Sequence, residues 1–339
     1  MKAWVLEDIN DIRLEEIDKP KAKEGHAIVK VASAGICGSD IARVYENGAH
    51  NMPLVIGHEF SGTVIDGDDK WKGSAVGVFP LIPCKKCEMC RQQKYEMCTD
   101  YNYLGSRCDG GFAKYVSVPL DNLIRLPQGV TADQAAMLEP MAVVVHAIRR
   151  ATDNMRLPSQ KKIAVSGLGT IGLLMIMFLI DGGYNNILAI GNKEYQKQML
   201  DKCNLNNVEY INSDSISDKD KVDVYFDCVG NYQSILRGVR MLRGEGVHLA
   251  VGNPASDINF DKDTYWKILR KQLKIIGTWN SSFTHDEDDD WHYVLKRLSK
   301  GAIKPQTLIT HTFELEKLKQ GLEIMKNKTE GYVKIMIKP

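Results

Sequence analysis

The feature of this 339-residue chain that most restricts its fold is a glycine-rich turn between a buried strand and an apolar helix. The strand is expected over residues 162–166 and the helix over residues 171–180. In such a unit the first glycine makes the tight turn, the second lets the backbone approach a pyrophosphate, and the third lets the helix pack on the strand. The turn therefore predicts a dinucleotide at the amino terminus of the helix, bound by Gly167, Gly169, Thr170, Ile171 and Gly172. A glycine-rich turn that binds nothing is the alternative.

Strands and helices continue to alternate after this turn, with strands expected at residues 187–190 and 222–227 and a helix at 193–203. Such alternation is typical of a doubly wound parallel sheet. Before about residue 140 the apolar runs are short and broken by Gly and Pro, which indicates a β-rich domain. A last alternating run at residues 332–337 is expected to rejoin that first domain.

Size and charge limit the partners of the chain. A length of 339 residues predicts two domains. Lys plus Arg (44) nearly equals Asp plus Glu (43), so no charge excess favours nucleic acid or an anionic membrane surface. Glu7 and Asp8 follow Met1 too closely for a signal peptide, and no apolar stretch spans a bilayer. We therefore expect a cytoplasmic protein that acts on a small molecule.

Four of the eight cysteines lie close together in one loop, at Cys84, Cys87, Cys90 and Cys98. In a reducing compartment such spacing favours metal binding over disulfides. Four thiolates close a tetrahedral zinc site without an open position, so the metal organises the loop. Disulfides and unligated thiols are the alternatives.

The end of the second strand of the doubly wound domain bears on the coenzyme. An acid usually stands there and accepts hydrogen bonds from the adenosine ribose, but this chain has Gly191, followed by Asn192 and Lys193. Loss of the carboxylate and gain of a cation favour NADP(H), with NAD(H) as the alternative. A Lys193 that only begins a solvated helix is the structural alternative.

A second set of metal-ligand types is dispersed along the chain, at Cys37, His58, Glu59 and Glu139. By spacing alone this set is weak, because single buried Cys and His residues are commonly only packed. However, the segments at residues 57–62, 109–115 and 139–140, the cysteine loop and the glycine turn occur in an order that resembles the zinc-containing medium-chain dehydrogenases. The resemblance covers essentially the whole chain.

That resemblance implies a GroES-like, β-rich catalytic domain from residues 1–145 and 282–339, enclosing a Rossmann coenzyme domain of residues 146–281. It implies two zinc ions per subunit and a homodimer or homotetramer. Cys37 and His58 would be ligands of the catalytic zinc. Glu139 matches the third ligand position, and Glu59 is either a ligand or holds the metal's water; which carboxylate binds at rest stays open.

The implied reaction passes a hydride from an alcohol to a nicotinamide coenzyme, with zinc lowering the pKa of the alcohol. Ser39 occupies the position of the hydroxyl that takes the alcohol proton; a helix-capping role is its alternative. Many relatives carry a His three residues later that passes the proton to solvent, whereas this chain has Ala42.

Glu59 and Glu139 together favour the polyol branch of this family, so a polyol substrate is expected. Residues 47–50, 105–107, 266–271 and 276–279 are most similar to galactitol-1-phosphate 5-dehydrogenases. Arg107 is a candidate for the substrate phosphate, with pairing to Asp109 as the structural alternative. Other polyol phosphates, free polyols and threonine-type alcohols are alternative substrates. A zinc-free quinone reductase and a non-catalytic nucleotide sensor are alternative functions on the same fold.

Overall fold

The computed structural model describes residues 1–155, 157–217 and 219–339. The chain divides into two compact units, one of Met1–Pro140 with Ser282–Pro339 and one of Met141–Ser281. In these described ranges no helix is long and apolar enough to cross a membrane.

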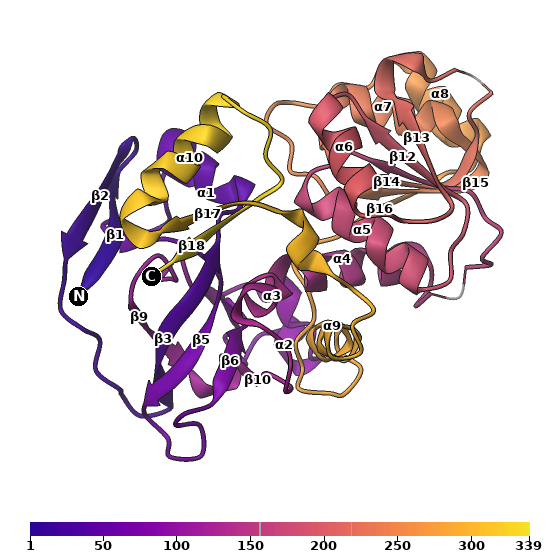
Figure 1. The fold of residues 1–339 in the computed structure, drawn as a ribbon. Helices are drawn as coiled ribbons and strands as arrows, with labels where there is room; N and C mark the ends of the chain where they lie inside the picture. Colours follow the sequence, from indigo (N-terminus) through magenta and orange to yellow (C-terminus); the bar gives the residue numbers. More distant parts are fainter. Residues whose placement is uncertain (156, 218) are drawn as a thin grey trace. The chain divides into compact units, whose positions relative to one another are not determined.

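The second unit is built on a six-stranded sheet in the order β13-β12-β11-β14-β15-β16, with every neighbouring pair parallel (Figure 1). This is the strand order of a Rossmann fold, so the predicted doubly wound α/β class is confirmed. Its strands are β11 (Ile163–Ser166), β12 (Ile187–Gly191), β13 (Val208–Asn212), β14 (Val222–Asp227), β15 (Leu242–Ala250) and β16 (Lys274–Gly277). Its helices are α5 (Thr170–Asp181), α6 (Glu194–Lys202), α7 (Tyr232–Met241) and α8 (Lys262–Arg270).

The central strands of this sheet are continuous apolar runs because helices cover both of their faces. All residues of β11 and β12 are buried. Helix α5 is apolar on nearly all sides and buries every residue from Gly172 to Leu179. Helix α6 begins one residue later than predicted, because Lys193 is extended (φ −123°) and caps the helix.

The first unit contains a seven-stranded sheet in the order β10-β6-β5-β3-β18-β17, with β9 paired to β3. Its strands are β3 (His26–Gly35), β5 (Glu59–Asp66), β6 (Ala75–Val78), β9 (Tyr115–Pro119), β10 (Leu123–Arg125), β17 (Ile309–Glu314) and β18 (Lys334–Lys338). Short sheets are formed by β1 (Lys2–Asp8), β2 (Asp11–Glu16) and β4 (Leu54–Val55), and by β7 (Leu81–Ile82) and β8 (Asn102–Tyr103). The helices are α1 (Gly38–Ala42), α2 (Glu88–Arg91), α3 (Ala132–Ala136), α9 (Asp290–Ser299) and α10 (Leu318–Asn327), and α4 (Leu138–Ala151) leads into the second unit.

The carboxyl-terminal tail returns to the first unit, as predicted. Strand β18 pairs antiparallel with β3 and parallel with β17 (Figure 1). Ile335 and Ile337 on this strand are fully buried in the same apolar core as Ala34 and Ile36. The burial of these side chains holds the last strand against a segment about three hundred positions away.

One residue of the acidic run at positions 286–290 caps helix α9. Asp289 is the residue that caps α9, and its carboxylate accepts hydrogen bonds from the backbone N–H groups of Thr284, His285 and His292. Acceptors at a helix start satisfy N–H groups that lack helical partners.

Candidate active site and metal centres

Two adjacent strand ends in the first unit bring three metal-ligand types together. Cys37 follows β3 and caps α1, while His58 directly precedes Glu59, the first residue of β5. Glu59 pairs in register with Gly35 at the end of β3. The ligand atoms of Cys37, His58 and Glu59 lie within 4.8 Å of one another. A thiolate, an imidazole and a carboxylate are the ligand types that catalytic zinc takes, so this set fits the metal.

The segment before His58 is held by contacts that only glycine permits. Gly57 has φ +98°, and its carbonyl accepts a hydrogen bond from Gly111 N at 2.7 Å. A Cβ atom on Gly105 or on Gly110 would collide with the carbonyl oxygen of Gly57. The loop around residues 105–111 therefore fits against the turn that carries His58.

Asp40 contacts two of the candidate ligand residues, Cys37 and His58. It is fully buried, accepts hydrogen bonds from Cys37 N and Arg43 Nη1 at 3.0 Å each, and lies 3.3 Å from His58 Nδ1. Burial opposes its ionisation, but His58 and Arg43 together hold the pKa of Asp40 below its usual value. Burial likewise disfavours a charged His58, yet the neighbouring Asp40 raises the pKa of His58. A carboxylate behind a ligand histidine fixes the orientation of its ring.

Ser39 lies at this cluster, and it does not cap the helix. Its Oγ is 3.5 Å from His58 Nε2 and accepts a hydrogen bond from Arg43 Nη1 at 3.0 Å. The residue that caps α1 is Cys37, so the capping alternative for Ser39 is wrong.

The two candidate glutamates have different surroundings. Glu59 forms a buried ion pair with Lys334, which also donates to Ile36 O at 3.1 Å. Glu139 accepts a hydrogen bond from Tyr103 Oη at 3.3 Å. Burial raises the pKa of Glu139 to about 7, and the charge of Glu59 acts in the same direction. The structure thus groups Glu59 with Cys37 and His58 and holds Glu139 beside them through Tyr103.

The four-cysteine loop has the geometry of a closed metal site. All eight cysteines are free thiols, and the Sγ atoms of Cys84 and Cys90, and of Cys87 and Cys98, lie 3.9 Å apart. That is close to the roughly 3.8 Å edge of a tetrahedron with zinc–sulfur bonds of about 2.3 Å, and far beyond a disulfide bond of about 2.05 Å. Backbone N–H groups of Thr99 and Cys90 lower the pKa of Cys87 to about 6. The residues fit zinc, and the disulfide alternative is wrong.

The glycine turn of the second unit has the conformation that each glycine was expected to allow. Gly167 has φ +93°, and a Cβ atom on Gly172 would collide with the carbonyl oxygen of Gly167. A Cβ atom on Gly169 would meet nothing within 4 Å. Gly169 caps α5, and Thr170 and Ile171 form its first turn, so open space lies at the helix amino terminus.

The second candidate coenzyme segment is partly exposed. Gly191 is the buried last residue of β12, whereas Asn192 and Lys193 are exposed. The backbone N–H of Asn192 donates to Gln196 Oε1 at 3.3 Å. In the described ranges Lys193 forms no ion pair, so its ammonium is available to a ligand.

Comparisons with known proteins agree with these sites. Residues 23–128 match the family described as Alcohol dehydrogenase GroES-like domain, and residues 132–338 match Glucose dehydrogenase C-terminus. Galactitol 1-phosphate 5-dehydrogenase of Escherichia coli (strain K12) is 32% identical, over 98% of this chain and 99% of that protein. The chain belongs to the zinc-dependent medium-chain alcohol and polyol dehydrogenases. It is therefore an NAD(P)-dependent oxidoreductase.

Two further comparisons extend over nearly the full length of this dehydrogenase. Sorbitol dehydrogenase of Bombyx mori is 28% identical, over 96% of this chain and 95% of that protein. The crystal structure of galactitol-1-phosphate dehydrogenase from Escherichia coli superposes with a TM-score of 0.90 at 29% identity, covering 100% of both chains.

Four side chains of the dehydrogenase site were not predicted from the sequence. Asp40 and Arg43 lie one turn apart on the segment after Cys37, and that i, i+3 spacing was a signal that could have been used. Tyr103 and Lys334 reach the site only through the tertiary fold, and no local pattern marks them.

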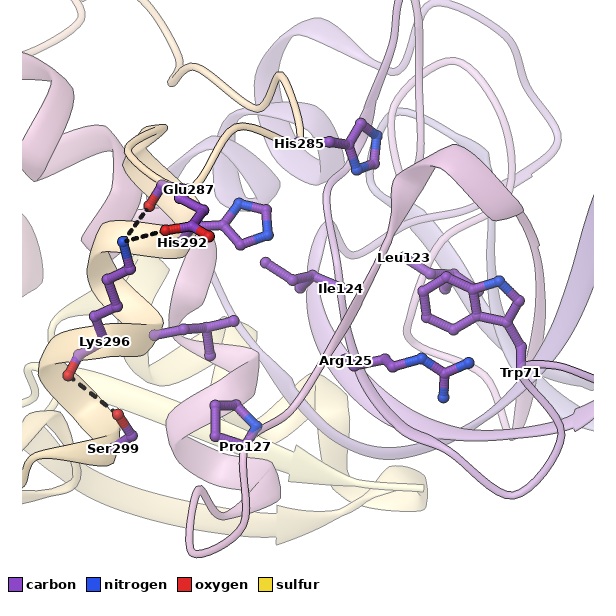
Figure 2. A pocket seen from close by; sticks show the side chains of 11 residues that line it. Trp71, Leu123, Ile124, Arg125, Pro127, His285, Glu287, His292, Lys296 and Ser299 are labelled. Carbon is purple, nitrogen blue, oxygen red and sulfur yellow. Dashed lines mark hydrogen bonds and ion pairs between the residues drawn. The ribbon is translucent and has the colours of Figure 1, made fainter.

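A pocket of about 410 Å³ elsewhere in the first unit contains none of these residues (Figure 2). The two cationic side chains that line this pocket are bonded within the protein. Lys296 donates to the carbonyl of Glu287, and Arg125 lies over the Trp71 ring at 4.3 Å and donates to Ser74 and Lys70. We therefore assign the chemistry of this dehydrogenase to the Cys37 cluster and not to this pocket.

Proposed function

We propose that the enzyme transfers a hydride between a nicotinamide coenzyme and a secondary alcohol of a polyol or polyol phosphate, with NADP(H) as the favoured coenzyme. The convergence of Cys37, His58 and Glu59, with Ser39 Oγ 3.5 Å from the His58 ring, carries this proposal. Residues 1–145 and 282–339 would form the catalytic zinc domain and residues 146–281 the coenzyme domain. Each subunit of a homodimer or homotetramer would hold two zinc ions.

Different residues of the site have different roles in the proposed reaction. Cys37, His58 and one of the two glutamates would hold the metal, while Asp40 and Arg43 orient His58 and Ser39. A zinc ion held there supplies a Lewis acid that lowers the pKa of an alcohol. Ser39 would accept the alcohol proton, a role supported by the 3.5 Å distance between its Oγ atom and His58 Nε2.

A polyol substrate is supported by the full-length similarity to enzymes whose names specify galactitol 1-phosphate and sorbitol. Free polyols and threonine-type alcohols are the alternatives. The preference for NADP(H) is supported by the absence of an acid at Gly191 and by the exposed Lys193, which forms no ion pair with the residues that the structure describes.

The decisive experiment combines metal analysis with steady-state assays. We expect about two zinc ions per chain in the wild-type protein, and turnover of polyols or their phosphates with NADP. His58→Ala and Cys37→Ser should lose one zinc and nearly all turnover while retaining coenzyme binding and the fold. Wild-type turnover in either variant, or a single zinc per wild-type chain, would rule out the catalytic metal site.

A further inference from the structure

Three nitrogen-bearing side chains of the first unit act on one another or come from segments in contact: Arg43, His50 and Arg107. Both guanidinium groups act electrostatically on His50, whose pKa is lowered by partial burial, by Arg107 and by Arg43. Backbone contacts hold the segments together, since His50 N donates to Ser106 O at 3.1 Å. Asn51 Nδ2 donates to Arg107 O at 2.7 Å.

Arg107 has an aromatic contact as its main side-chain partner in the protein. Its guanidinium lies over the Tyr101 ring at 4.4 Å. In the described part of the chain it forms no ion pair, and its buried Nε has no hydrogen-bond partner. Asp109, the carboxylate expected to pair with it, instead accepts a hydrogen bond from Val55 N at 3.0 Å. The alternative that Arg107 pairs with Asp109 is therefore wrong.

Arg43 connects this region to the reacting end of the site. Its Nη1 atom contacts Ser39 and Asp40, and all of its hydrogen bonds among the described residues use that one atom. The side chain is 19% exposed. A guanidinium carries five N–H donors, so the groups on Nε and Nη2 remain available to a ligand.

Two guanidinium groups with unused donors are suited to a dianion. Arginine binds phosphate with two parallel hydrogen bonds, and buried donors without acceptors are costly unless a ligand supplies them. A free polyol is neutral and would gain little from this charge. Of the two guanidinium groups, only that of Arg43 is paired with the Asp40 carboxylate among the described residues.

We infer that Arg43, His50 and Arg107 form a phosphate subsite that makes the enzyme selective for a phosphorylated polyol over the same polyol without phosphate. This inference rests on the proposed function and narrows its substrate class. Arg107 and His50 donate to the phosphate, and Arg43, which also donates to Ser39 at 3.0 Å, links the subsite to the reacting end of the site.

The test compares galactitol 1-phosphate with galactitol, using the full-length, zinc-loaded protein. Wild type should give a higher kcat/KM and tighter calorimetric binding with the phosphate. Arg107→Gln should lower the ratio of kcat/KM values for the two substrates by about 10- to 100-fold, mainly through KM, because one or two charged hydrogen bonds are lost. Arg125→Gln is the matched control: it also removes a guanidinium stacked on an aromatic ring, but outside the subsite, and it should leave the ratio unchanged.

The outcomes separate this inference from the proposed function. Equal efficiency and binding of both compounds in wild type, or an unchanged ratio in Arg107→Gln, would overturn the phosphate subsite, even if both compounds are oxidised. Phosphate-selective binding that Arg107→Gln removes, without turnover of any polyol, would support the subsite and contradict the proposed reaction.

Discussion

At the scale of single residues, the least expected feature is a lysine buried beside the metal ligands. Lys334 and Glu59 are each 2% exposed, and they contact one another. Removing one partner of such a pair leaves a charge buried without compensation. Lys334 therefore controls the environment of one of the two candidate carboxylate ligands.

We predict that Lys334→Met lowers the free energy of unfolding by about 3–5 kcal/mol, because the carboxylate of Glu59 loses its counter-charge. Glu59→Gln added to Lys334→Met should recover part of that loss, since the unpaired charge is then gone. Urea unfolding of the zinc-free proteins measures both effects without interference from the metal. A double variant as unstable as Lys334→Met would contradict this account of the ion pair.

The prediction that NADP(H) is preferred over NAD(H) depends on Gly191 and Lys193. Lys193→Ala should lower the NADP/NAD ratio of kcat/KM by roughly tenfold, the effect of losing one charged hydrogen bond. Gly191→Asp should lower it further by adding a ribose acceptor. It should also cost stability, because a Cβ atom there would lie 3.0–3.2 Å from Leu168, Gln196 and Tyr210. Equal or better use of NAD by the wild-type enzyme would show that Lys193 only faces solvent.

Residue types in known motifs could be predicted from the sequence, but their supporting contacts could not. Cys37 and His58 were identified because they stand in motifs of the family. Lys334 was not, because its partner lies 275 positions away and an alternating strand pattern predicts only which face it occupies. Arg107 was identified as a cation near the substrate, but no sequence pattern predicts that it stacks on Tyr101.

At the scale of elements, the position of His58 depends on glycine contacts between a strand end and a loop. We predict that Gly110→Ala destabilises the first unit and lowers zinc content and turnover, because its new methyl group would collide with the carbonyl of Gly57. Gly277→Ala is the control, since a Cβ atom there meets nothing within 4 Å. Melting temperature, zinc content and kcat distinguish the two variants. Normal zinc content in Gly110→Ala would show that the loop does not position His58.

The elements that the sequence predicted best are those buried on both faces. Strands β11 and β12 are buried throughout and β14 at all positions but Asp223, and each was predicted to within one residue. Strands β13 and β16, at the two edges of the same sheet, were not predicted. Their side chains are mostly exposed or half-buried, so edge strands lack the apolar signal. Pairing with a neighbour, which is a tertiary property, makes them strands.

At the scale of the whole molecule, the chain places its two kinds of ligand site on different units. The Cys37 cluster and the four-cysteine loop lie within Met1–Pro140, whereas the glycine turn and Lys193 lie within Met141–Ser281. A ligand stabilises the folded region that it binds by an amount set by its concentration relative to its Kd. Metal and coenzyme should therefore stabilise different parts of the protein.

We predict that thermal unfolding followed by calorimetry shows two transitions that respond to different ligands. NADP at about 100 times its Kd should stabilise the second unit by about 2.7 kcal/mol. Chelation of zinc, or Cys90→Ser, should lower the other transition, because a closed cysteine site contributes folding free energy. Cys203→Ser, which removes a thiol outside both metal clusters, is the control and should leave zinc content unchanged. A single transition that NADP and the chelator shift to the same extent would mean that the two units unfold as one cooperative body.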